Sequence, residues 1–186
     1  TLVVTSSGRN DFRCKGFDVL ICALKKLQQR NLAKDVLAII AVPCWKEGPR
    51  KDLESKVNES KTDNENQPLS EPFITHTLYN FNEDRIVNTI KGYGIGMSKE
   101  EKLHILFIPS YLDGNDGIVN LKYYDWLTAS DLCLYPSYYE PWGYTCLESI
   151  AFGIPCLTTD LAGFGVWANS VVGHNSMLKD GVQVIH

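Results

Sequence analysis

The sequence predicts an α/β fold built on a doubly wound parallel sheet. Short apolar runs, of the kind that form strands buried on both faces, recur along the chain. Between them lie segments whose apolar residues follow the helical period. This alternation favours parallel strands joined by right-handed crossovers, because each helix carries the chain back to the edge where the previous strand began.

Composition and charge limit the classes of function. The 186 residues are 44% hydrophobic, which is enough for a packed core. With 18 Lys+Arg against 22 Asp+Glu, the formal net charge of -4 argues against a nucleic-acid partner, although a local anion pocket stays open. The longest nearly apolar stretch, residues 36–45, contains Pro43 and is too short to span a membrane.

The chain begins without an initiator Met or a hydrophobic signal segment, so we expect a piece of a longer, cytoplasmic protein. Its 6 cysteines include no short-spaced pair of the kind that binds metals or forms redox motifs. We therefore expect reduced thiols.

The first part of the chain predicts a strand, a helix and a second strand. Residues 2–5 are rich in β-formers, residues 17–27 carry apolar side chains at helical spacing, and residues 36–42 are continuously apolar. Residues 46–72 are polar instead. There we expect a helix near 51–59 and a mobile connection without chemistry over the remainder.

Glycines punctuate the middle of the chain. Order resumes over residues 73–78, after which Asn82 can cap a helix that stops at Gly92. Gly92, Gly94 and Gly96 form a spaced run. A phosphate-binding glycine loop precedes a helix, whereas this run follows one, so we expect a turn.

The alternation continues to the end of the chain. Apolar runs predict strands, and helical spacing predicts helices between the first three of them. The expected strands are residues 103–108, 131–135, 154–158 and 182–185, and the expected helices are residues 122–129 and 145–152.

Parallel sheets of this kind bind ligands beyond the carboxyl ends of their strands. The loops expected there are residues 5–16, 109–120, 136–144 and 159–165. The first loop carries Arg9 and Lys15, and the third turns into a helix. Cations beside the first amides of a helix indicate an anion site.

Three alternatives stay open from the residues alone. Thr145 and Glu148 have the spacing of a capping box, which would satisfy helix amides without any ligand. Glu140 is either a surface charge or a ligand to sugar hydroxyls. The neighbouring aromatic residues either stack on a base or sugar or pack in the core; they are Tyr123, Tyr138, Tyr139, Trp142 and Tyr144.

Several motifs carry a family resemblance, above all the string SYYEPWGYT at residues 137–145, with Glu148 shortly after it. The others are Gly8-Arg9, Lys15-Gly16, Thr75-His76, Tyr123-Tyr124-Asp125, Gly153-Ile154-Pro155 and Gly163-Phe164-Gly165. In these motifs the chain resembles glycogen synthase of the animal and fungal type, family 3 of the glycosyltransferases.

The resemblance implies the Rossmann-like C-terminal half of a GT-B enzyme, with residues 1–186 as the nucleotide-sugar donor domain and the acceptor-binding N-terminal half absent. The implied reaction transfers glucose from UDP-glucose, with retention, to the nonreducing end of an α-1,4-glucan. No cofactor or metal is expected. The implied partners are UDP-glucose, glucan, the missing half and, in the full-length protein, a possible second copy.

The resemblance also assigns roles to residues. Arg9 and Lys15 match residues that contact the donor diphosphate, and Glu140 matches the one that contacts the transferred glucose; these three are the expected catalytic residues. The expected substrate-binding residues are Gly8, Tyr123, Trp142, Gly143, Tyr144, Thr145 and Glu148. Among them, Tyr123 matches the residue that stacks on uracil and Glu148 the one that holds the ribose hydroxyls.

The chain departs from the family pattern at two places. Cys14 stands where the family commonly has Asn, and Cys146-Leu147 replaces Pro-Ala. These exchanges should leave the main ligands in place. Two other functions stay open beside the first: a related retaining transferase with another donor or acceptor, and a noncatalytic module that binds sugar nucleotides.

Overall fold

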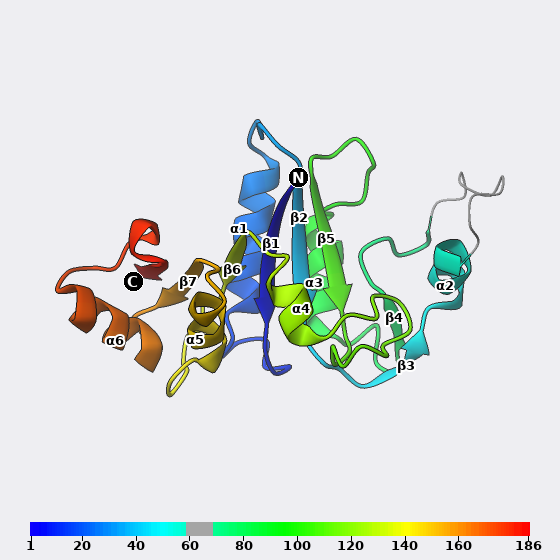
Figure 1. The fold of residues 1–186 in the computed structure, drawn as a ribbon. Coiled ribbons are helices and arrows are strands. Elements are labelled where there is room, and N and C mark those ends of the chain that lie inside the picture. The colour runs from blue at the N-terminus through cyan, green and yellow to red at the C-terminus, as the bar shows by residue number, and fades with distance from the viewer. Residues whose placement is uncertain (59–68) are drawn as a thin grey trace.

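Six parallel strands form the sheet in the order β5-β2-β1-β6-β7-β8 (Figure 1). They are β1 (Leu2–Ser7), β2 (Val36–Ala41), β5 (Leu103–Ile108), β6 (Leu132–Leu134), β7 (Cys156–Thr159) and β8 (Val182–Ile185). This computed structural model describes residues 1–58 and 69–186. The predicted parallel α/β sheet is confirmed, and the strand expected at residues 103–108 has the predicted bounds.

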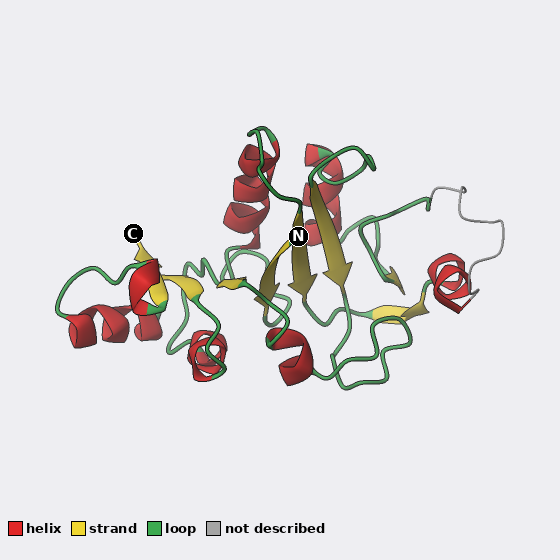
Figure 2. Cartoon of the chain, turned by 45° about the horizontal axis from the view of Figure 1, so that its top comes forward, coloured by secondary structure: helices red, strands yellow, loops and turns green. Residues whose placement is uncertain are grey.

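Helices cover both faces of the sheet (Figures 1 and 2). The described helices are α1 (Phe17–Gln28), α2 (Lys51–Asn58), α3 (Arg85–Tyr93), α4 (Tyr123–Leu127), α5 (Tyr144–Ala151) and α6 (Gly163–Val172), with a short 3-10 helix at Leu178–Asp180. Of these, α2 lies apart from the sheet (Figure 1). Helices α1 and α3 lie together on one face, whereas α4 covers the other. None of the helices in the described ranges is long and apolar enough to cross a membrane.

The alternation of side chains along β2 explains the two covered faces. Ala38 and Ile40 belong to the core under α1 and α3, whereas Ile39 and Ala41 pack with Trp126 of α4 on the opposite face. Full burial of an aliphatic side chain contributes roughly 1.5–3 kcal/mol, so both faces stabilise the central strands. A third cluster joins α5 and α6 to β6, β7 and β8.

The direction of winding reverses beside β1. Strand β1 pairs with β2 from Leu2↔Val36 to Ser7↔Ala41, and β5 extends the sheet beyond β2. The chain then returns to the other side of β1, where β6 pairs at Val4↔Leu132. Such a reversal separates the loops that follow the two neighbouring strands and leaves a crevice at their carboxyl ends.

The polar stretch 46–72 contains more structure than we predicted. The expected helix is confirmed as α2, but the strands β3 (Lys46–Pro49) and β4 (His76–Leu78) form an antiparallel ribbon that we did not predict. Strand β3 consists of charged residues, a glycine and a proline, so no alternation of apolar residues marks it as a strand. The rest of the predicted mobile connection falls in two parts. Residues 59–68 lie outside the described residues, and residues 69–72 contain a bend near the buried Arg50.

Two predictions at helix ends were wrong. Asp84, not Asn82, caps α3: its Oδ1 accepts from the amide of Val87 at 3.0 Å. The helix runs past Gly92 to Gly94, which has φ +59° and closes it, and this confirms a turn in the glycine run.

Helix α6 was not predicted, because residues 159–165 were assigned to a loop. Gly163 and Gly165 lie in its first turn, where a Cβ atom would overlap the carbonyl oxygens of Pro141 and Thr159, respectively. These glycines therefore allow close packing rather than loop flexibility. The 6 cysteines are all free thiols, as predicted.

We expect Gly16→Ala to lower the free energy of unfolding by at least about 3 kcal/mol. Gly16 has φ +69°, and its Cβ would overlap the carbonyl oxygen of Pro136. Gly153→Ala is the matched control, because Gly153 has φ +76° and no atom of the described residues would lie within 4 Å of its Cβ. The free energy of unfolding of Gly153→Ala should fall only by the cost of a left-handed backbone at a residue with a side chain, about 1–2 kcal/mol. Equal losses in urea unfolding would contradict the role assigned to the contact with Pro136.

Candidate functional site

Two adjoining cavities lie where the strands of the sheet end. The larger, about 450 Å³, is the cation cavity, lined by Gly8, Arg9, Asn10, Lys15, Pro43, Tyr111, Glu140, Tyr144 and Thr145. The smaller, about 310 Å³, is the tyrosine cavity, lined by Ser7, Gly8, Ala41, Pro43, Ser110, Tyr111, Leu112, Asp113, Tyr123, Thr145 and Glu148. Four residues line both, so the two cavities form one continuous site.

An ion pair between Lys15 and Glu140 crosses the cation cavity. The Lys15 Nζ donates to the Glu140 carboxylate, and the side chains are only 13% and 21% exposed. The lysine stem passes beside Gly8, where its Cε would lie 3.4 Å from a Cβ, an ordinary packing distance. On the other side, the amide of Gly163 donates to the Glu140 carbonyl oxygen at 3.0 Å and fixes the backbone. The structure therefore joins two predicted catalytic residues that are 125 positions apart.

Arg9 lines the same cavity and is an exposed residue. Within the described ranges its side chain makes no hydrogen bond or salt bridge, and its backbone carbonyl accepts from the amide of Asp11 at 2.8 Å. An arginine stays charged at every physiological pH and offers a fork of N–H donors that matches phosphate oxygens. This cation is thus available to an anion without first breaking a protein contact.

Helix α5 adds polar backbone groups to the cation cavity. Gly143, with φ +107°, precedes its first residue, and the first intrahelical bond is donated by the amide of Cys146 to the Gly143 carbonyl at 3.2 Å. The amides of Tyr144 and Thr145 belong to the first turn, which has no earlier carbonyl to bond. Both residues line the cavity. Unbonded amides and the positive end of the helix dipole favour an anion there.

The capping-box explanation of Thr145 and Glu148 is wrong. The residue before α5 is Gly143, which makes no side-chain cap, so Thr145 is already the second residue of the helix. The Glu148 Oε1 instead accepts from the Tyr124 hydroxyl at 3.2 Å. The charge of Glu148 raises the pKa of Tyr124, which keeps that phenol protonated. Glu148 thus lines the tyrosine cavity and does not cap the start of α5.

Tyr123 forms a half-buried wall of the tyrosine cavity. Its hydroxyl and the Ser7 Oγ are 3.2 Å apart, and its ring lies 5.2 Å from Tyr124 and 6.2 Å from Trp126. Burial raises the pKa of Tyr123 to about 12, so the phenol is neutral. A neutral ring held on its inner side is suited to stack on a flat ligand.

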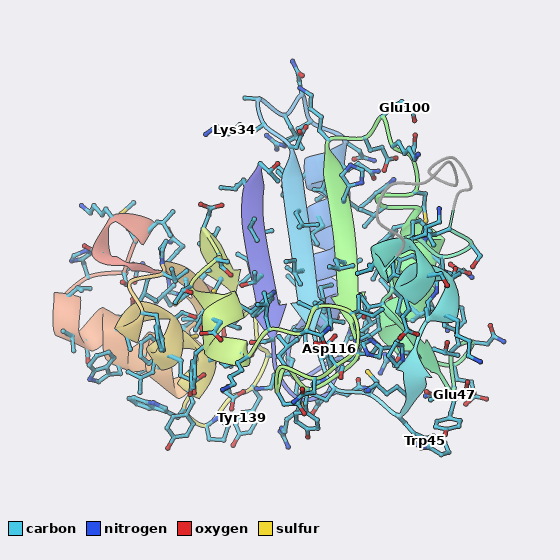
Figure 3. The ribbon with its side chains drawn as sticks, turned by 45° about the vertical axis from the view of Figure 1, so that its right-hand side comes forward. Lys34, Trp45, Glu47, Glu100, Asp116 and Tyr139 are labelled. Carbon is cyan, nitrogen blue, oxygen red and sulfur yellow. The ribbon has the colours of Figure 1, made fainter. Side chains whose placement is uncertain are left out.

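Not every predicted site residue reaches the cavities. Trp142 does not line either one: its ring packs edge-on against Phe164 at 5.8 Å and lies 6.0 Å from Trp167. Gly143 acts through the start of α5. Tyr138 and Tyr139 are exposed at the carboxyl edge of the sheet, where Figure 3 shows Tyr139. The predicted residues that do line the site are Gly8, Arg9, Lys15, Tyr123, Glu140, Tyr144, Thr145 and Glu148.

Other residues that line the site were not predicted from the sequence. Tyr111, which is 76% exposed, borders both cavities and lies in a loop that was predicted to reach the site. Its position after β5 was the available signal. Asn10 had the same kind of signal, because it lies in the loop 5–16 that follows β1, whereas Pro43 lies outside the loops that were predicted to reach the site. In the part of the chain that the structure describes, no three His, Cys, Asp or Glu side chains are placed to share a metal ion.

Comparisons with known proteins identify relatives of this chain. The family model described as glycogen synthase matches residues 56–186. Glycogen [starch] synthase isoform 2 of Saccharomyces cerevisiae is 32% identical over 114 residues, which are 61% of this chain and 16% of that protein. The liver glycogen [starch] synthase of Mus musculus is 33% identical over 101 residues, which are 54% of this chain and 14% of that protein.

Solved structures share the fold. A trehalose-6-phosphate synthase, OtsA, superposes with a TM-score of 0.54 at 12% identity, over 91% of this chain and 31% of its own. An Escherichia coli structure described as trehalose-6-phosphate bound with UDP-2-fluoro glucose gives 0.55, also at 12% identity, over 91% of this chain and 32% of its own. At such identity the likeness concerns the GT-B fold alone.

The chain spans about one sixth of the length of the curated relatives that it matches. The family model nevertheless covers well over half of the chain, including every motif from Thr75-His76 onward. The resemblance seen in the sequence is thereby confirmed, and the chain belongs to the glycogen synthase family.

Proposed function

We propose that this chain is the donor-binding part of a retaining glucosyltransferase, which transfers glucose from UDP-glucose to the nonreducing end of an α-1,4-glucan. The observation that carries the proposal is the continuous site at the switch point, with Arg9, the Lys15–Glu140 pair and the start of α5 at one end and Tyr123 and Glu148 at the other. Family membership supports it. A protein of the same fold was solved with a UDP-sugar analogue.

The diphosphate would occupy the cation cavity. Arg9, Lys15 and the amides of Tyr144 and Thr145 offer donors there, each charge-assisted hydrogen bond contributing about 1.5–3 kcal/mol. The same donors would stabilise the negative charge that develops as UDP departs. Since cations and amides supply this charge stabilisation, the proposal requires no metal ion.

The nucleoside would occupy the tyrosine cavity. Tyr123 would stack on the base, and the Glu148 carboxylate would accept hydrogen bonds from the ribose hydroxyls. Glu148 is suited to this role because, in the described part of the chain, the Tyr124 hydroxyl alone donates to its carboxylate, which leaves lone pairs unused. The mainly apolar wall of Ala41, Pro43 and Leu112 fits the flat faces of a base.

Glu140 would face the transferred glucose. Its carboxylate would orient the sugar hydroxyls and stabilise positive charge at the anomeric carbon; we do not assign it a covalent bond to the sugar. Lys15 carries three donors, so it can hold Glu140 and a phosphate oxygen together. The glucan groove and the opposite wall of the glucose site would come from an N-terminal half, in a cytoplasmic protein. The chain alone should therefore bind the donor without turnover.

Calorimetric titration at fixed salt, without divalent metal, tests this proposal. We expect UDP and UDP-glucose to bind and ADP to bind more weakly. Arg9→Ala should weaken UDP binding more than tenfold, because loss of a charge-assisted bond costs at least about 1.4 kcal/mol. Arg13→Ala is the control, since Arg13 pairs with Asp18 and does not line the cation cavity. Preference for ADP would indicate another donor, and no binding would contradict the donor-domain function.

We expect Glu148→Gln to weaken UDP binding about tenfold while the free energy of unfolding changes by less than about 0.5 kcal/mol. Glu148 does not cap α5, so the helix does not depend on its charge. Tyr124→Phe removes the hydroxyl bonded to Glu148 but keeps the ring that stacks on Phe152, and it should bind UDP nearly normally. A drop in stability with unchanged UDP affinity would restore the structural explanation.

Glu140→Gln should separate the two ends of the donor. We expect UDP to bind this variant about threefold more tightly, because Lys15 loses a charged competitor for the phosphate and like-charge repulsion falls. The affinity for UDP-glucose should rise less than the affinity for UDP, since the glucose loses its contact with the Glu140 carboxylate. Parallel titrations of both ligands measure the difference. Much weaker UDP binding would mean instead that Glu140 must hold Lys15 in place.

A further inference from the structure

The Thr75-His76 motif has no role in the donor site described above. His76, the first residue of β4, is fully buried and lines neither the cation cavity nor the tyrosine cavity. Its Nε2 lies 2.9 Å from the backbone carbonyl oxygen of Asp116, which is 40 positions away. Asp116 belongs to the segment between β5 and α4, residues 109–122, which we name the β5–α4 loop. The contact therefore ties this loop to the β3–β4 ribbon.

The hydrogen-bond partners of His76 fix the state of its ring. A carbonyl oxygen only accepts, so the Nε2 carries the hydrogen and donates it to Asp116. The Nδ1 lies 2.8 Å from the Thr75 hydroxyl and accepts from it. Burial lowers the pKa of His76, which keeps the ring neutral with one donor and one acceptor. Removal of the ring would leave the Asp116 carbonyl oxygen without this donor.

The β5–α4 loop folds around the side chain of Asp116. Within residues 111–120, Asp116 alone is buried, at 4% exposure. Its Oδ1 accepts from the amides of Ile118 and Val119 at 3.1 and 2.8 Å, and its Oδ2 accepts from that of Asn120 at 2.7 Å. These bonds order the second half of the loop around one carboxylate. The tie to β4 therefore holds the residue on which the conformation of the loop depends.

A second contact seats the loop on the same ribbon. Gly117 has φ +90°, and a Cβ there would overlap the Cγ of Pro49 in β3. Pro49 is paired with His76 in the register of the ribbon, so both contacts fall at one place. Figure 3 shows Asp116 beyond the ends of the central strands, on the side of the ribbon. No residue of β3 or β4 lines the two cavities, so the ribbon reaches the site only through this loop.

The first half of the β5–α4 loop forms a wall of the tyrosine cavity. The lining residues that it supplies are Ser110, Tyr111, Leu112 and Asp113. At the base of the loop, the amide of Tyr123 donates to the Leu112 carbonyl oxygen at 2.9 Å. The base alone would let the loop turn about its two ends, whereas the tie at Asp116 fixes it at a third point. The position of the wall thus depends on a residue outside the site.

We propose that His76 is a positioning residue for the nucleoside end of the donor site: it holds the β5–α4 loop on the ribbon and thereby sets the wall of the tyrosine cavity. The proposal rests on the proposed function, which places the nucleoside in that cavity. Binding at the phosphate end should not depend on His76, because Arg9, Lys15 and the start of α5 come from other elements.

Parallel titrations of the full chain with UDP and with pyrophosphate test this role. We expect His76→Leu to weaken UDP binding about tenfold and pyrophosphate binding less than about twofold, because only the nucleoside end loses its wall. His76→Gln should recover most of the UDP affinity, since its side-chain amide can still donate to the Asp116 carbonyl oxygen. Equal weakening of both ligands would overturn the proposal, because a general loss of structure would explain it.

Arg50→Met is the matched control beside the ribbon. Arg50 is also buried, and its guanidinium donates to the carbonyl oxygen of Ile74 at 3.2 Å, outside the β5–α4 loop. This variant should unfold at a lower urea concentration while its UDP affinity stays within about twofold of wild type. A loss of UDP affinity as large as that of His76→Leu would contradict a specific role for His76.

Asp116→Asn tests the same tie from the loop if His76→Leu does not fold. The amide of the new side chain would turn a donor toward a backbone N–H that Asp116 now accepts, such as that of Asn120. We expect UDP binding to weaken about fivefold and pyrophosphate binding to stay nearly unchanged. Wild-type affinity for UDP would refute the dependence of the wall on this loop.

Hydrogen exchange without ligand separates this proposal from the donor function. The amides of Ile118, Val119 and Asn120 should exchange at least about tenfold faster in His76→Leu than in the wild-type chain. If the wild-type chain binds UDP and His76→Leu binds it equally well, the positioning role is refuted and the donor function stands. If the wild-type chain does not bind UDP, the donor function fails, and exchange decides whether His76 holds the loop: unchanged rates would overturn it as well.

Discussion

The site depends on the adjacency of β1 and β6 at the point where the winding of the sheet reverses. Their following loops approach so closely that Gly16 has no room for a side chain beside the Pro136 carbonyl. That approach brings Lys15 to Glu140, although the two lie far apart in sequence. A parallel sheet wound in one direction would instead cover this crevice with a crossover, so the topology itself creates the space for a ligand.

The same adjacency gives the site two ends that would recognise a ligand differently, one by charge and the other by shape. At one end, Lys15 already has a carboxylate partner, while the Arg9 side chain has none among the described residues, so a phosphate would gain one cation without competition and share another. At the other end, Tyr123 is neutral and held by Ser7, which leaves recognition there to stacking and to Glu148. Breaking a partly buried ion pair leaves a desolvated charge without its partner. A phosphate that shares Lys15 with Glu140 therefore costs less free energy than one that displaces Glu140 from Lys15.

Sequence periodicity predicted the sheet because its strands are buried on both faces and read as unbroken apolar runs. It could not predict the β3–β4 ribbon, where Lys46–Pro49 has neither apolar alternation nor β-branched residues. The glycines of α6 resembled a loop because close backbone approach leaves no hydrophobic signature. Aromatic density near Glu140 was likewise ambiguous: Tyr144 reaches the cavity, whereas Trp142 joins the core, and only the course of the backbone separates the two.

The two departures from the family pattern are compatible with an intact site, because the backbone contacts that place the site do not depend on the side chains of Cys14 and Cys146. The carbonyl oxygen of Cys14 accepts the amides of Tyr138 at 2.9 Å and Tyr139 at 3.4 Å, so any side chain at this position can hold the loop that carries Glu140. Cys146 is the third residue of α5, where proline is tolerated because the first turn uses few amides. Cysteine adds one donor, which bonds the Gly143 carbonyl. The exchange of proline for cysteine therefore replaces a fixed dihedral angle with a hydrogen bond and leaves the start of α5 directed at the cation cavity.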